Sequence, residues 1–161
     1  MNAKMDAKTD ERTNELLIWC AGNVLLGDDA AGCTVAELLR AAGKKGVVDC
    51  GTTPENHVAT LRGNPPVVLL IVDAADMGLR AGEIRLLPLE KMEAVADSSH
   101  GIPLSLLLEP FMTVMEIVAL GIQPASLRPG APLSGAVDEA VRRVADLILT
   151  DRWRETEILG A

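Results

Sequence analysis

Aromatic residues are almost absent from this chain. It contains one phenylalanine, two tryptophans and no tyrosine, which together make 2% of the sequence. The hydrophobic core must therefore be packed mainly from leucine, valine, isoleucine, alanine and methionine. Hydrophobic residues still amount to 48% and charged residues to 24%, a balance typical of globular proteins. The length of 161 residues predicts one domain.

Positive charge is also scarce. Fifteen lysines and arginines stand against 23 acidic residues, for a formal net charge of −8. Nucleic acids and anionic membrane surfaces are therefore not expected partners, because their binding requires basic patches. No apolar run approaches the length of a membrane span, and residues 1–14 lack the apolar core of a signal peptide. We expect a flexible polar leader over 1–14, a single domain over 15–161 and a cytoplasmic location.

The three cysteines share no spacing typical of a metal site. Cys20, Cys33 and Cys50 are an odd number, so they do not form a disulfide framework. Free cysteines are among the most often buried side chains. We therefore interpret all three as small core residues.

The phosphate-binding motifs are missing as well. Gly22 and Gly27 have the spacing of a phosphate loop, but Asp28 and Asp29 stand where such a loop needs lysine and serine or threonine. Two carboxylates would repel a phosphate. The Gly-x-Gly-x-x-Gly pattern of dinucleotide sites and the Gly-x-Ser-x-Gly pattern of serine hydrolases are also absent. The turn is therefore suited to a positive ligand, and a metal ion is the simplest candidate.

What the chain does contain is an alternation of short apolar runs and helical patterns. This alternation predicts an α/β fold, a three-layer sandwich with a twisted, mostly parallel five-stranded sheet between helices. The predicted strands are 16–21, 47–50, 67–73, 83–87 and 116–121. The predicted helices are 31–42, 54–62, 104–109 and one that begins after Ser134 as its N-cap and runs through Ile148.

Three features are expected at one edge of that sheet. Asp29 follows the first strand, Asp73 ends the third strand, and His100 follows the fourth. With the common strand order 2-1-3-4-5, strands one and three are neighbours where ligands bind in such sheets. Two carboxylates and an imidazole suit a divalent cation such as Ni²⁺ or Zn²⁺ with open positions for chemistry.

Each of these residues also has a purely structural interpretation. Asp28 or Asp29 could cap the following helix, and Asp73 could be a turn residue that bonds to its own backbone. His100, taken alone, is more often a surface histidine than a metal ligand.

Gly22 to Gly32, with the sequence GNVLLGDDAAG, resembles the signature of the [NiFe]-hydrogenase maturation endopeptidases, nearest to the hydrogenase 3 type or an archaeal relative. Further blocks follow in the family's order, so that the resemblance extends over residues 16–150. They are 51–56 (GTTPEN), 70–78 (LIVDAADMG), 82–85 (GEIR), Ser99-His100 with Pro103-Leu104, and 120–124 (LGIQP).

The resemblance implies an enzyme that removes a C-terminal peptide from the precursor of the hydrogenase large subunit after nickel insertion. The family's metal-contacting residues fall on Asp29, Asp73 and His100, with Asp29 and Asp73 also in the catalytic role. We expect Gly27, Asp28 and Asp76 to contact substrate, and Asp28 or Asp76 could act as general base.

The resemblance further implies that the nickel is presented by the substrate and serves as the recognition element. Other divalent cations could occupy the same ligands. Two alternatives stay open from the sequence. One is a non-catalytic module that senses a metallated partner, and the other is a nucleotide-binding module, which the missing phosphate motifs disfavour.

Overall fold

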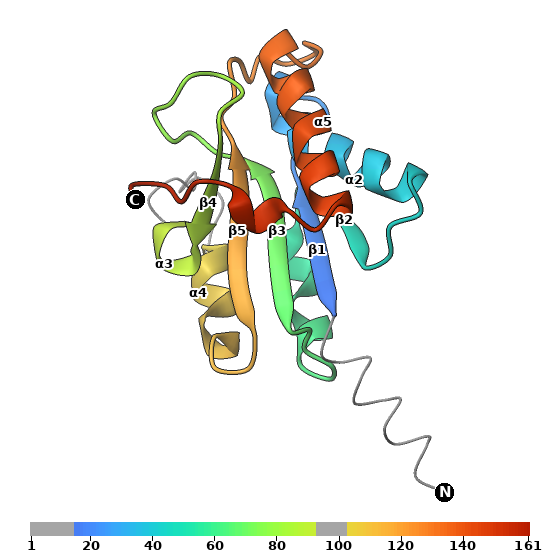
Figure 1. Cartoon of the computed structure of the whole chain (residues 1–161), viewed down its shortest axis with the longest axis vertical. Helices are drawn as coiled ribbons and strands as arrows, with labels where there is room; N and C mark the ends of the chain where they lie inside the picture. The colour runs from blue at the N-terminus through green and yellow to red at the C-terminus, as the bar shows by residue number, and fades with distance from the viewer. Residues whose placement is uncertain (1–14, 93–102) are drawn as a thin grey trace, which may run out of the picture.

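The computed structural model describes residues 15–92 and 103–161. A five-stranded sheet lies at its centre with strand order β2-β1-β3-β5-β4 (Figure 1). Four strands are parallel, and β4 runs antiparallel to β5. The strands are β1 (Leu16–Ala21), β2 (Val47–Gly51), β3 (Val68–Ala74), β4 (Ile84–Pro88) and β5 (Glu116–Ile122).

The order of the last two strands differs from the expected 2-1-3-4-5 arrangement. No helix connects β3 to β4, whereas a parallel neighbour requires a crossover connection. The chain therefore returns as an antiparallel edge strand, and β5 occupies the place beside β3. The part of the expectation that concerns the site is confirmed, because β1 and β3 are hydrogen-bonded neighbours.

Helices cover both faces of the sheet and make the predicted three layers. On one face lie α2 (Ala31–Ala41) and α5 (Gly135–Leu149), which pack against each other as well. The opposite face is covered by four short helices. They are η2 (Pro54–Leu61), α3 (Leu89–Met92), α4 (Leu104–Leu108) and η3 (Glu109–Phe111). The segment expected as a helix over 54–62 is thus a 3₁₀ helix.

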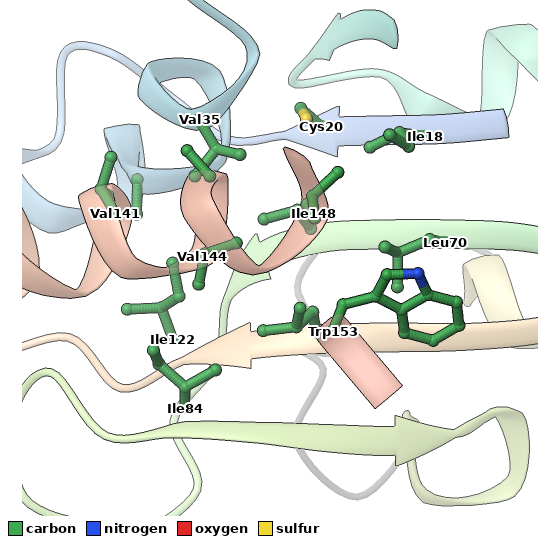
Figure 2. Close-up of a cluster of buried hydrophobic side chains, with 14 of the residues drawn as sticks. Ile18, Cys20, Val35, Leu70, Ile84, Ile122, Val141, Val144, Ile148 and Trp153 are labelled. Atoms are coloured by element: carbon green, nitrogen blue, oxygen red, sulfur yellow. The ribbon is translucent and has the colours of Figure 1, made fainter. Parts of the chain in front are cut away.

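The core between the sheet and the α2–α5 face is almost entirely aliphatic, as the composition predicts. Figure 2 shows Ile18 and Leu70 of the sheet facing Val35 of α2 and Ile148 of α5, all of them fully buried. Successive strand residues point to opposite faces, so Trp19 and Ile71 belong to the core on the other side. Because the inner strands are buried on both faces, they appear in the sequence as continuous apolar runs.

The segment that follows α5 also packs onto the sheet. It contains η4 (Trp153–Glu155), and the Trp153 side chain is 2% exposed in the core of Figure 2. The Leu86 N–H donates to the Glu157 carbonyl at 2.9 Å, and the Leu159 N–H donates to the Leu86 carbonyl at 2.9 Å. The C-terminal segment therefore pairs with the outer edge of β4. The sequence of this segment is charged and weakly patterned, and only Trp153 hints at its burial.

The described residues bear on the state of the cysteines and on membrane-spanning helices. Cys20, Cys33 and Cys50 are all free and buried, which agrees with their interpretation as core residues. In the described ranges, no helix combines the length and the apolar character that crossing a membrane requires.

Candidate functional site

The candidate site lies at the edge of the sheet where the parallel strands end. Cys20 of β1 is paired with Val72 of β3, so Asp73 follows immediately beyond this pair. The chain after β1 turns into η1 (Gly27–Ala30), which contains Asp29 and contacts β3. The loops after β1, β3 and β5 therefore meet at one edge of the molecule (Figure 1). This is the edge at which open α/β sheets bind ligands.

Asp29 is held by a tight turn that folds back on it. The Asn23 N–H donates to Asp29 Oδ2 at 3.0 Å and to the Asp29 carbonyl at 3.1 Å. Gly22 permits this approach, because a Cβ at that position would lie 2.1 Å from the Asp29 carbonyl oxygen. The Asn23 side chain in turn accepts from the Leu25 N–H at 2.9 Å. The turn thus orients a half-buried carboxylate at the rim of the sheet.

Asp73 experiences the charge of Asp29. Burial raises the pKa of the Asp73 carboxyl well above its usual range, and the negative charge of Asp29 raises it further, against a smaller opposing effect of the Ala74 N–H. The two carboxylates are therefore close enough for the charge of Asp29 to disfavour the ionisation of Asp73. Such a pair can bind a cation or hold a proton.

Asp28 has a very different environment from its neighbour. Asp28 is only 1% exposed, and its carboxylate accepts four hydrogen bonds from the loop after β5. The donors are the N–H groups of Ala125 (2.8 Å), Ser126 (3.1 Å) and Ser134 (2.7 Å) and the Ser134 hydroxyl (2.9 Å). Burial alone would raise the pKa of Asp28, but the hydrogen bonds outweigh it and hold the pKa below its usual value.

This geometry favours a structural role for Asp28 over the predicted substrate contact or general base. The oxygens are occupied, and a depressed pKa makes the carboxylate a weak proton acceptor. Helix capping, the structural alternative for either acid, is not observed either. The N-cap positions of η1 and α2 are Leu26 and Ala30, and neither makes a side-chain cap.

Gly27 belongs to the same junction between two loops. It is buried with φ 54°, and a Cβ there would lie 2.7 Å from the Ser126 carbonyl oxygen. The Asp28 N–H donates to that carbonyl at 2.9 Å, and the Gly130 N–H donates to the Leu25 carbonyl at 2.9 Å. Gly27 therefore permits the close packing of the two loops, and its predicted contact with substrate remains a prediction.

Gln123 connects the loop after β3 to the loop after β5, and the sequence analysis assigned no role to it. The side chain is in a residue 6% exposed, and its Oε1 accepts from the N–H groups of Met77 (2.7 Å) and Leu79 (3.2 Å). Its Nε2 donates to Asp76 Oδ1 at 3.1 Å, which is the main reason that the pKa of exposed Asp76 is lowered. A polar residue directly after the apolar strand β5 was the available signal.

Cys33 of α2 lies beside the acidic pair. Its Sγ donates to the Gly22 carbonyl at 3.6 Å, so it braces the turn that holds Asp29. Burial, together with Asp49, Asp73 and Asp29, raises the pKa of this thiol to about 12. In the absence of a metal, Cys33 is therefore a neutral thiol at physiological pH.

The third predicted metal ligand, His100, lies outside the described residues. Asp29 and Asp73 provide two oxygen ligands that suit a divalent cation paired with an imidazole. Within 15–92 and 103–161, no three His, Cys, Asp or Glu residues are placed to hold a metal ion by themselves. The metal set of Asp29, Asp73 and His100 remains a prediction.

Comparison with known proteins agrees with this architecture. A family model described as "Hydrogenase maturation protease" matches residues 33–151. The chain is 39% identical over 132 residues to the hydrogenase 3 maturation protease of Escherichia coli (strain K12), which covers 80% of this chain and 85% of the relative.

Solved structures give the same result. A crystal structure of a hydrogenase 3 maturation protease superposes with a TM-score of 0.81 at 34% identity, covering 91% of this chain and 97% of that chain. A [NiFe] hydrogenase maturation protease from Thermococcus kodakarensis KOD1 superposes with a TM-score of 0.74 at 30% identity, covering 91% and 99%.

Proposed function

This chain belongs to the hydrogenase maturation protease family, and from that premise we propose that it removes a C-terminal peptide from the precursor of a [NiFe]-hydrogenase large subunit. It is accordingly a hydrolase, and the proteases among its relatives weigh against a non-catalytic metal-sensing module. The reaction takes place in the cytoplasm on this proposal, where three free, buried cysteines stay reduced.

The juxtaposition of Asp29 and Asp73 carries the proposal. The negative charge of Asp29 raises the pKa of Asp73, so an incoming cation relieves a repulsion that the protein itself maintains. In the proposed complex, Asp29, Asp73 and His100 engage the nickel ion already bound in the substrate. The metal then acts as the recognition element, because only a nickel-loaded precursor brings a cation to the two carboxylates.

Hydrolysis requires a water molecule to add to the scissile carbonyl carbon, after which the C–N bond breaks and the leaving amine takes a proton. In the proposed complex, the acceptor for the proton of that water is a carboxylate oxygen of Asp73 that the nickel does not bind. Asp28 and Asp76 are less suited, because hydrogen bonds hold the pKa of each below its usual value.

The decisive experiment is intact-mass analysis of the large-subunit precursor after incubation with this protein, with and without nickel in the precursor. Loss of a C-terminal peptide only from the nickel-loaded form is the expected result. Loss from both forms would contradict nickel recognition while retaining the protease. No loss from either form, across all hydrogenase precursors of the source organism, would contradict the proposed function.

Single substitutions test the assignment of the acidic pair. Asp29→Asn and Asp73→Asn should each lower the cleavage rate by about a hundredfold or more, which is typical for loss of an acid–base or charge-stabilising group. Asp138→Asn is the matched control, because it removes a carboxylate that is 47% exposed on α5. A wild-type rate in either site variant would contradict the assignment of that residue.

A further inference from the structure

We propose that Val24, Leu25 and Leu127 form a docking surface for an apolar strip of the precursor, next to the acidic pair. These three residues are called the apolar rim below. The inference rests on the proposed function and adds the surface by which the substrate is held. It is separate from the carboxylates, since none of the three side chains can take part in hydrolysis.

The apolar rim is exposed to an extent that folding alone does not explain. Val24 is 65% exposed, Leu25 70% and Leu127 49%. The three side chains come from two loops far apart in the sequence, which meet through the Gly130–Leu25 backbone bond at 2.9 Å. Grouped exposed apolar side chains of this kind mark protein-binding surfaces more often than isolated ones do.

The loops that present the rim are firmly held. Four hydrogen bonds to the Asp28 carboxylate and one from the Asp28 N–H fix the loop after β5 against η1. A partner that covers Leu25 and Leu127 therefore does not have to order them first. Preformed surfaces bind more tightly for the same contact area, because less conformational entropy is lost.

The rim is also continuous with the proposed site. Leu25 precedes Asp29 by four residues, so the two Cα atoms are at most about 14 Å apart even in an extended chain. The actual separation is shorter, because the Asp29 N–H folds back to the Leu26 carbonyl at 3.0 Å. A protein whose metal ion reaches Asp29 consequently comes within about 14 Å of Leu25, close enough for its surface to contact the apolar rim.

Charge indicates which partner fits. In the loop segments 23–27 and 124–134, Arg128 is the only ionisable side chain, although the chain has a net charge of −8. The surface beside Asp29 is therefore apolar with one positive group. It fits a protein that brings a cation to Asp29, apolar side chains to the rim and a carboxylate to Arg128. A second copy of this acidic chain would instead bring like charges together.

The chain offers a matched control at the other end of the sheet. Val114 is 58% exposed, close to the 65% of Val24, and precedes β5 at the edge opposite the site. A Val24→Ser/Leu25→Ser double variant should raise KM for the nickel-loaded precursor about tenfold with kcat unchanged, or about 1.4 kcal/mol of binding. Val114→Ser should leave both constants at wild-type values.

The outcomes separate this proposal from the one on which it rests. Absence of cleavage by the wild-type protein overturns the proposed function itself. Cleavage with the same KM in the wild type and the double variant overturns only the docking surface. Light scattering tests whether a second copy of the chain covers the rim instead. If the wild type is a dimer and the double variant is a monomer, the rim is an interface between two copies, and this result also overturns the proposal.

Thermal unfolding of each variant and of the wild type shows whether the substitutions disturb the fold. If the double variant melts at a lower temperature than the wild type, Leu127→Ser is used as the test variant in its place, because Leu127 lies in the loop after β5. That variant alone must then raise KM, and an unchanged KM overturns the docking surface.

Discussion

Two segments of this protein are attached to the sheet by opposite means. The η1 turn is joined to the loop after β5 by a buried carboxylate, Asp28, that accepts four hydrogen bonds. The C-terminal segment, residues 151–161, buries one large apolar side chain, Trp153, and pairs with β4 through backbone hydrogen bonds. Around Trp153 the polar contacts are exposed, as in the Arg154–Glu116 ion pair at 2.7 Å.

The difference follows from what each segment has to do. A buried tryptophan and backbone pairing hold the C-terminal segment on the edge of β4 without orienting any side chain of the site. Several directed hydrogen bonds to one carboxylate define the orientation of the next residue, Asp29, and a site with a rim carboxylate requires that. The polar junction therefore affects activity and stability together, whereas Trp153 affects stability alone.

The largest expected effect follows the loss of Trp153. Trp153→Ala removes a side chain that is 2% exposed in the core, and loss of a buried aromatic costs about 3–5 kcal/mol of unfolding free energy. Urea unfolding measures this loss. The cleavage rate per folded molecule should stay unchanged. A parallel fall in that rate would contradict the claim that Trp153 affects stability alone.

Asp28→Ala should cost somewhat less stability, about 3 kcal/mol, because buried donors from Ala125, Ser126 and Ser134 lose their acceptor. Unlike the first variant, it should also lower the cleavage rate at least about tenfold, since Asp29 is no longer held in position. Denaturant unfolding and the mass assay measure the two effects. Asp28→Asn, which retains one acceptor oxygen, should fall between the wild type and alanine. Full activity in Asp28→Ala would show that the junction does not position Asp29.

Acid should weaken the polar junction selectively. The folded-state pKa of Asp28 lies below its ordinary value of 3.8, so its stabilising effect is complete above that pH. The effect is lost as the pH falls through the folded-state pKa, because the unfolded state takes up a proton at Asp28 at a higher pH than the native state does. Unfolding free energies measured from pH 5 downward should fall more steeply in the wild type than in Asp28→Asn. Equal slopes would contradict the depressed pKa.

The smallest effect is expected at the exposed ion pair of the C-terminal segment. Glu116→Gln removes the partner of Arg154, and the two side chains are 48% and 56% exposed. Such pairs contribute about 0–1 kcal/mol, and less at high salt. Thermal unfolding in low and high salt should show a small difference that disappears with added salt. A loss above about 2 kcal/mol would mean that the segment depends on polar contacts after all.

Local sequence patterns predicted most of the elements. The strand over Leu16–Ala21 agrees with β1 at both ends, because a strand buried on both faces is a continuous apolar run bounded by glycine and polar residues. Ser134 was predicted as an N-cap, and its hydroxyl accepts from the Val137 N–H at 3.4 Å. Both features depend on neighbours in the chain, which the sequence displays directly.

The different environments of Asp28 and Asp29 could not be predicted from local patterns, although the family resemblance placed the metal contact on Asp29. They are adjacent, identical residues in one turn, and nothing local distinguishes them. The distinction depends on Ser134, 106 residues further along the chain, which donates to Asp28 and leaves Asp29 at the rim.

The sequence by itself therefore determined the elements, the family and the acidic edge, since these depend on short-range periodicity and on motifs in order. Tertiary structure alone decided that β5 separates β3 from β4, that Trp153 buries the C-terminal segment, and that Gln123 joins the loops after β3 and β5. Each of these depends on which distant groups meet when the chain packs. The reason is physical, because hydrogen bonds and burial form wherever the folded geometry brings partners together, whatever their separation in sequence.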